Sequence, residues 1–174
     1  GSGAGCSRPS PTSSPTRRTG RARRNGLRSF SSLTTMPPNG ASEALDLTMR
    51  VLVKLPGPGK VLLGRPYYYS YPPIVEFAGL EPVYTDLKNG RIDILDFEKK
   101  IKHAKAVLIN SPSNPTGRVE DMETLRAIEK ITEKLGVYVI SDEVYKDLIY
   151  ERENYLIKGR HVITINSFSK TYSL

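Results

Sequence analysis

The chain has 174 residues, a formal net charge of +8 at pH 7, 38% hydrophobic residues and a single cysteine, Cys6. This length is typical of one domain, and one cysteine excludes an internal disulfide framework. No apolar run approaches the roughly 18 residues of a membrane-spanning helix. The sequence therefore predicts neither a membrane protein nor a disulfide-rich secreted one.

The positive charge is concentrated in the first 38 residues, which hold seven arginines, no lysine and no acidic residue. Residues 39–174 hold nineteen basic residues and all eighteen acidic ones, so this part is nearly neutral. A nearly neutral body gives no support to general nucleic-acid binding. We therefore expect neither nucleic acid nor a membrane as a partner.

Residues 1–38 consist mainly of Ser, Arg, Pro, Gly and Thr, with hardly an apolar side chain before Leu27 and Phe30. Such a segment cannot bury enough surface to offset its ordering entropy, so we expect a disordered basic tail. We prefer the interpretation that residues 1–38 are foreign to the natural protein, because all their basic residues are arginines, whereas residues 39–174 are rich in lysine. An organelle transit peptide comes second, and a phosphate-binding arm third. The expected location is the cytoplasm, or an organelle if the tail is a transit peptide.

From Asn39 onward, the sequence predicts helices that alternate with strands. The expected helices span residues 44–54, 73–78, 95–103, 120–135 and, as a short element, 142–150. The expected strands span residues 60–64, 81–86, 106–110, 137–140 and 162–166. Strands separated by helices imply right-handed crossovers and a mainly parallel sheet. We therefore predict an α/β fold with three layers, α/β/α.

Three of the predicted strands are followed by residues that can carry chemistry, namely Asn114, Asp142 and Lys170. In an open α/β sheet, ligands bind beyond the carboxyl ends of the strands, so we expect these side chains to form one site. A pyridoxal cofactor needs such a set, with a lysine for the Schiff base and an acid that keeps the pyridine nitrogen protonated.

The segments that carry these residues resemble the class I/II aminotransferases, which are fold type I pyridoxal-phosphate enzymes. They are Ser-Pro-Ser-Asn-Pro-Thr-Gly at 111–117, Ser-Asp-Glu-Val-Tyr at 141–145 and Ser-Phe-Ser-Lys-Thr-Tyr-Ser-Leu at 167–174. The resemblance covers residues 39–174 and implies the larger part of that family's cofactor-binding domain. It also implies pyridoxal 5′-phosphate as cofactor, ping-pong exchange of an amino group between an amino acid and a 2-oxo acid, and a homodimer.

The resemblance implies a role for each matching position. Lys170 would form the Schiff base and, once released, move a proton between the substrate Cα and the cofactor. Asp142 would pair with the pyridine nitrogen. Asn114 and Tyr145 would donate hydrogen bonds to the phenolic oxygen, and Tyr68 would stack on the ring.

Four further positions are implied as contacts of the cofactor phosphate. Ala41 and Ser42 open a predicted helix and would offer backbone N–H groups and a hydroxyl. Ser42 is also the expected N-cap of that helix. Ser167 and Ser169 would add hydroxyls.

Each residue also has a purely structural interpretation. The sequence Asn-Pro-Thr-Gly forms a good turn whatever its function, and Asp142 could cap a following helix. Lys170 could be a solvated surface lysine, and the stacking role could belong to Tyr67 or Tyr69. Neither histidine has metal-ligating neighbours in the sequence, so we expect no metal site.

The resemblance further predicts that the chain is a fragment whose C-terminal small domain is absent. The family places one arginine for the cofactor phosphate shortly beyond the lysine, and another for the substrate carboxylate in the small domain. Neither has a counterpart in residues 1–174, so we expect this chain alone to bind cofactor weakly and catalyse little. Two alternatives stay open, a lyase or synthase with the same cofactor and a non-catalytic amino-acid sensor.

Overall fold

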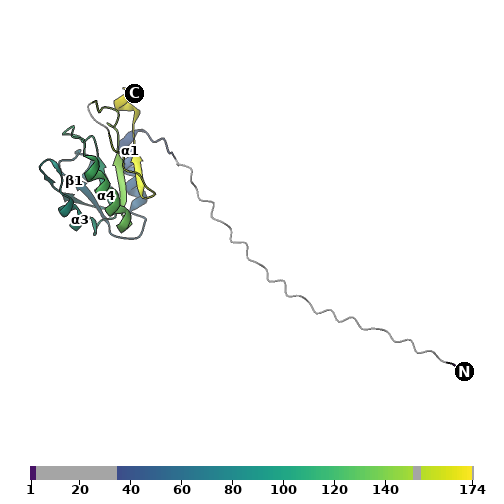
Figure 1. The fold of residues 1–174 in the computed structure, drawn as a ribbon. Helices are drawn as coiled ribbons and strands as arrows, with labels where there is room; N and C mark the ends of the chain where they lie inside the picture. Colours follow the sequence, from purple (N-terminus) through teal and green to yellow (C-terminus); the bar gives the residue numbers. More distant parts are fainter. Residues whose placement is uncertain (3–34, 151–153, 174) are drawn as a thin grey trace. The chain divides into compact units, whose positions relative to one another are not determined.

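The structure is a computed structural model that describes residues 1–2, 35–150 and 154–173. The chain divides into two units, residues 1–35 and 36–174, and the helices and strands described all belong to the second (Figure 1). The prediction of a disordered tail over residues 1–38 lies almost entirely outside the described residues.

A five-stranded parallel sheet runs through the second unit in the order β2-β1-β5-β6-β7. Its strands are β1 (Lys60–Gly64), β2 (Glu81–Thr85), β5 (Ala106–Asn110), β6 (Tyr138–Asp142) and β7 (Val162–Ile165). A separate antiparallel pair, β3 (Leu87–Lys88) and β4 (Arg91–Ile92), encloses a turn at Asn89 and Gly90. The predicted strands and the parallel sheet are confirmed, and β6 extends far enough that Asp142 is its last residue.

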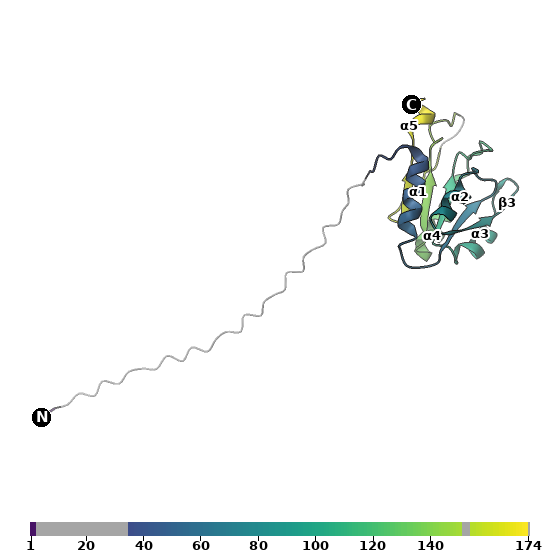
Figure 2. The same ribbon diagram turned by 180° about the vertical axis from the view of Figure 1, so that it is seen from behind.

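Helices cover both faces of the sheet (Figures 1 and 2). On one face, α1 (Gly40–Leu52) and α2 (Tyr71–Phe77) pack against alternate residues of β1, β5 and β6. On the other face, α3 (Ile94–Ile101) and α4 (Met122–Leu135) pack against the remaining strand residues. The predicted three-layer α/β/α architecture is confirmed. A short helix that was not predicted, α5 (Phe168–Thr171), follows β7.

Local sequence signals set the ends of helix α4. Asp121 is its N-cap and accepts a hydrogen bond from the backbone N–H of Thr124 at 2.9 Å. Gly136 ends the helix in the left-handed conformation, with φ of 66°. Met122 and Leu135 are each 41% exposed because they are the first and last residues of the helix.

The helix predicted for residues 142–150 is wrong. The chain forms turns there instead, the first closed by the N–H of Lys146 donating to the carbonyl of Glu143 at 3.0 Å. A carboxylate oxygen of Asp142 accepts the backbone N–H of Val144 at 3.3 Å. An aspartate side chain that takes a backbone N–H in this way competes with helix formation. Asp142 therefore does not cap a helix, as its purely structural interpretation expected; it accepts a backbone N–H within a turn.

Lys105 holds the C-terminal end of α1 in place at the amino ends of the strands, immediately before β5. It is 7% exposed, and its Nζ donates to the carbonyl oxygens of Leu52 at 3.0 Å and Leu55 at 2.6 Å. The last carbonyl groups of a helix have no partner within the helix, and a cation suits that end of the helix dipole. This single side chain therefore ties α1 to the start of β5.

We expect Lys105→Met to lower the free energy of unfolding by about 1–3 kcal/mol, because the carbonyl groups of Leu52 and Leu55 lose the lysine donor. The Leu52 carbonyl keeps the backbone N–H of Leu55 at 3.1 Å. Chemical denaturation measures the change. The matched control is Lys102→Met, at an exposed lysine three residues earlier, which should change the free energy of unfolding by less than about 0.5 kcal/mol. Equal effects of the two substitutions would contradict this role for Lys105.

Candidate active site

Asp142 is buried at the carboxyl end of β6, with 4% of its surface exposed. One carboxylate oxygen accepts the hydroxyl of Tyr71 at 2.7 Å, and the other accepts the backbone N–H of Val144. Burial raises the pKa of Asp142, and these two hydrogen bonds oppose the rise. Within residues 35–150 and 154–173, no basic side chain forms a salt bridge with it. The carboxylate is thus held by neutral donors and can still accept a hydrogen bond from a cation.

Tyr71, the first residue of α2, is a site residue that the sequence analysis missed. It is 3% exposed, and burial followed by the nearby charge of Asp142 raises its pKa far above the ordinary value. The hydroxyl therefore stays protonated and acts as a donor. The only sequence signal is its place in the tyrosine-rich run 67–71, and nothing in that run connects it with an acid 71 residues away.

The structure separates the three candidates for the stacking aromatic. Tyr68 lies edge-on against Tyr71, with ring centroids 5.5 Å apart. Tyr67 stacks instead on Tyr84 of β2, and Tyr69 is 77% exposed. Among the ring pairs of the described residues, Tyr68 is thus the one of the three that pairs with Tyr71, the partner of the buried acid.

Asn114, Tyr145 and Lys170 lie together although they come from three separate segments. The side-chain amide of Asn114 donates to the hydroxyl of Tyr145 at 3.3 Å. The Nζ of Lys170, an exposed residue of α5, lies 6.0 Å from the centre of the Tyr145 ring. In the described part of the chain no hydrogen bond joins Lys170 directly to Asp142.

The prediction that Ser42 is the N-cap of α1 is wrong. The chain turns into the helix two residues earlier, at Gly40, whose φ of 82° favours glycine, and Asn39 takes the N-cap position. Ala41 and Ser42 are therefore the second and third residues of a 13-residue helix. Their backbone N–H groups have no acceptor within the helix, an arrangement that suits an anion.

The two serines beside α5 contact each other. The hydroxyl oxygen of Ser167 accepts the backbone N–H of Ser169 at 3.2 Å, and the two hydroxyl oxygens are 2.7 Å apart. Ser167 thereby caps α5. No hydrogen bond among the described residues links this pair to Ala41 or Ser42, so the predicted phosphate contacts form two separate groups.

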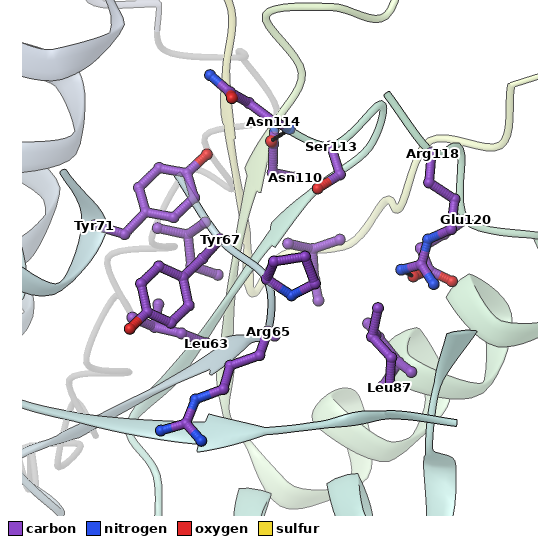
Figure 3. Close-up of a pocket in the computed structure, with 15 residues that line it drawn as sticks. Leu63, Arg65, Tyr67, Tyr71, Leu87, Asn110, Ser113, Asn114, Arg118 and Glu120 are labelled. Atoms are coloured by element: carbon purple, nitrogen blue, oxygen red, sulfur yellow. Dashed lines mark hydrogen bonds and ion pairs between the residues drawn. The ribbon is translucent and has the colours of Figure 1, made fainter. Parts of the chain in front are cut away.

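A small pocket lies at the carboxyl ends of β1 and β5, lined in part by Tyr71 and Asn114 (Figure 3). Tyr67 and Tyr71 lie on one side of it, and Arg118 and Glu120 form an ion pair on the other. Its volume of about 30 Å³ holds one or two water molecules and is too small for a pyridine ring.

Because the Tyr71 hydroxyl stabilises the charged form of Asp142, we expect Tyr71→Phe to raise the pKa of that carboxyl further. Titration of the Asp142 carboxyl carbon by NMR measures this. The matched control is Tyr69→Phe, at an exposed tyrosine two residues earlier, and it should leave the titration unchanged. An unchanged Asp142 titration in Tyr71→Phe would show that the hydrogen bond does not act on the carboxylate.

The raised pKa of Asp142 also predicts how stability depends on pH. Between the ordinary value of 3.8 and the raised value, the folded state binds more protons than the unfolded chain, so stability falls as pH rises through this range. An asparagine at this position carries no charge; its Oδ1 can accept the Val144 N–H while its Nδ2 donates to the Tyr71 hydroxyl oxygen. We therefore expect the stability of Asp142→Asn relative to the unsubstituted protein to increase from pH 3.8 to pH 7, measured by denaturation at each pH. A constant difference over that range would rule out the proposed burial penalty.

Comparisons with known proteins support the family and the fold. Residues 20–174 match the family described as aminotransferase class I and II. The chain is 39% identical over 139 residues to a probable aspartate aminotransferase of Methanocaldococcus jannaschii, covering 78% of this chain and 36% of the relative. It is 36% identical over 147 residues to the aspartate aminotransferase of Geobacillus stearothermophilus, covering 78% of this chain and 37% of the relative.

Solved structures agree with these matches. A tetra mutant of Thermus thermophilus aspartate aminotransferase aligns with a TM-score of 0.72 at 31% identity, over 78% of this chain and 39% of that one. Alanine aminotransferase from Pyrococcus furiosus aligns with a TM-score of 0.68 at 34% identity, over 76% of this chain and 35% of that one. The chain thus spans little more than a third of the length of the relatives and structures that it matches.

Proposed function

The chain belongs to the class I and II aminotransferase family, and from this premise we propose that it is part of a pyridoxal-phosphate-dependent aminotransferase. One observation carries the proposal: Asp142, the Asn114–Tyr145 pair and Lys170 lie at the carboxyl ends of adjacent parallel strands. The proposed reaction of the whole protein is ping-pong exchange of an amino group between an amino acid and a 2-oxo acid.

The chemistry of Asp142 fits a pyridine nitrogen. Bound pyridoxal 5′-phosphate supplies an electron sink for charge that develops at the substrate Cα, provided that its ring nitrogen is protonated. Asp142 is a buried carboxylate with neutral donors and, among the described residues, no counter-cation. A charge-assisted hydrogen bond to a ring N–H would supply the missing positive charge and would be worth roughly 1.5–3 kcal/mol.

The Asn114–Tyr145 pair fits the phenolic oxygen of the same ring. The Tyr145 hydroxyl accepts a hydrogen bond from Asn114, so its own hydrogen is free to donate. The Asn114 amide likewise keeps a second hydrogen. Two donors aimed at one oxygen would stabilise its anion.

The remaining residues have supporting roles in the proposal. Lys170, exposed and above the Tyr145 ring, would supply the amine that joins the cofactor aldehyde, and would then move the substrate Cα proton. Tyr68 would stack on the ring. The phosphate would be bound by the first turn of α1, at Ala41 and Ser42, and by the hydroxyl groups of Ser167 and Ser169.

The relatives are named for different substrates, and this limits how precisely a substrate can be proposed for this chain. They include aspartate, aspartate/prephenate and N-acetyl-LL-diaminopimelate aminotransferases, so the family match leaves the amino donor open. The proposal is therefore confined to an amino acid and a 2-oxo acid as substrates. It includes a homodimer, which rests on the family resemblance. It also includes a cytoplasmic location, or an organelle if residues 1–38 are a transit peptide. No helix in the described part of the chain is long and apolar enough to cross a membrane.

The test is chemical capture of the cofactor. We expect that incubation with pyridoxal 5′-phosphate, borohydride reduction and peptide mass spectrometry will find the cofactor mass on Lys170, and that Lys170→Ala will abolish this labelling. Lys146→Ala serves as the matched control, because Lys146 lies in the turn after β6 and pairs with Glu143 at 3.9 Å. Labelling at Lys170 should persist in that control. Equal labelling of many surface lysines, with none preferred, would contradict the proposal.

A further inference from the structure

Asn110 is the last residue of β5 and has no role in the family resemblance. It is half-buried, lines the small pocket and pairs in register with Asp142, the last residue of β6 (Figure 3). It also comes four residues before Asn114. Its side chain therefore lies between the candidate acid and the candidate amide.

Both ends of the Asn110 side chain are bonded. Its Nδ2 donates to the backbone carbonyl of Asp142 at 3.1 Å, and its Oδ1 accepts the backbone N–H of Asn114 at 2.7 Å. Reversing the amide would set a donor against a donor at Asn114 and an acceptor against an acceptor at Asp142. The two contacts therefore fix the orientation of the amide and require an asparagine, since no other side chain of this length both donates and accepts in this way.

These bonds connect two segments that otherwise have few links. The other backbone hydrogen bonds described for residues 111–118 stay within that loop, such as Ser113 N–H to the carbonyl of Arg118 at 2.8 Å. Towards β6, the loop has only the bonds of Asn110 and the contact between Asn114 and Tyr145 among the described residues. Among the described residues, the position of the loop relative to Asp142 thus depends on the Asn110 amide together with the Asn114–Tyr145 hydrogen bond.

We propose that Asn110 is a positioning residue that sets the distance between Asp142 and Asn114. This inference rests on the proposed function, because these two residues would contact opposite sides of one cofactor ring. The nitrogen of a pyridine and its phenolic oxygen are held at a fixed separation by the ring. The protein must therefore hold their partners at a matching separation, and small errors in placement are costly in catalysis.

The first experiment follows the backbone amide of Asn114 by hydrogen exchange. Asn110→Ala removes both bonds and should accelerate exchange at Asn114 roughly five- to tenfold. Asn110→Asp keeps an acceptor for the Asn114 N–H, so exchange should return close to that of the unsubstituted protein. Asn89→Gly is the matched control, because Asn89 is exposed in the turn between β3 and β4, has no role in the proposed site, and has a φ of 52° that glycine adopts readily.

The second experiment measures the dissociation constant of pyridoxal 5′-phosphate by absorbance. We expect it to rise roughly tenfold in Asn110→Ala and also in Asn110→Asp, since both variants lose the donor to the Asp142 carbonyl. Asn89→Gly should leave the dissociation constant unchanged. If Asn110 only stabilised the fold, Asn110→Ala would lower the melting temperature, and Asn110→Asp would not restore slow hydrogen exchange at Asn114.

The outcomes separate this inference from the proposed function. Failure of the unsubstituted protein to take up the cofactor would remove the proposed function, and the positioning role with it. Uptake that is unaffected by Asn110→Ala, or Asn114 exchange that is unchanged in that variant, would overturn the positioning role alone. Faster exchange that aspartate reverses, together with weaker cofactor binding in both variants, would support it.

Discussion

The parallel pairing of β5 with β6 is the constraint on which the site depends. Its register sets Ala106 opposite Tyr138 and continues to Asn110 opposite Asp142, so both strands end at the same level. A shift of one residue would turn every side chain of β6 to the other face of the sheet. The alternating contacts of Leu108 and Ile140 with one helical layer, and of Val107 and Val139 with the other, oppose such a shift. Core packing thereby fixes the position of the acid.

The burial of Asp142 has an energetic cost that its neighbours reduce. Moving a carboxylate out of water disfavours its charged form, which is why its pKa is raised. The Tyr71 hydroxyl and the Val144 N–H offset part of this cost without adding positive charge. A lysine or arginine in the same place would neutralise the carboxylate and leave it little affinity for a cationic ring. Neutral donors keep the acid in place while preserving its charge for a ligand.

The sequence predicted what depends on local chemistry and on the order of elements. Alternating helices and strands gave the parallel sheet, and strand ends brought Asn114 close to Tyr145 and Lys170. The prediction from sequence failed where the role of a residue depends on a contact with a residue far away in the chain. Nothing near Tyr71 indicates that its hydroxyl meets Asp142, because that contact arises only when α2 packs on the sheet. The helix expected after Asp142 failed for a nearer reason, a side chain that bonds its own backbone.

The candidate residues divide into a buried group and an exposed one, and this division matches their proposed tasks. Asp142 and Tyr71 are buried, with their hydrogen bonds made, on a central strand and a packed helix. Lys170 is exposed on a four-residue helix, and its amine has a cation–π contact with the Tyr145 ring at 6.0 Å. Groups that stabilise charge act best when they need no reorganisation. A lysine that must first bond an aldehyde and then carry a proton needs a free, flexible side chain, which is what its long stem on a short exposed helix provides.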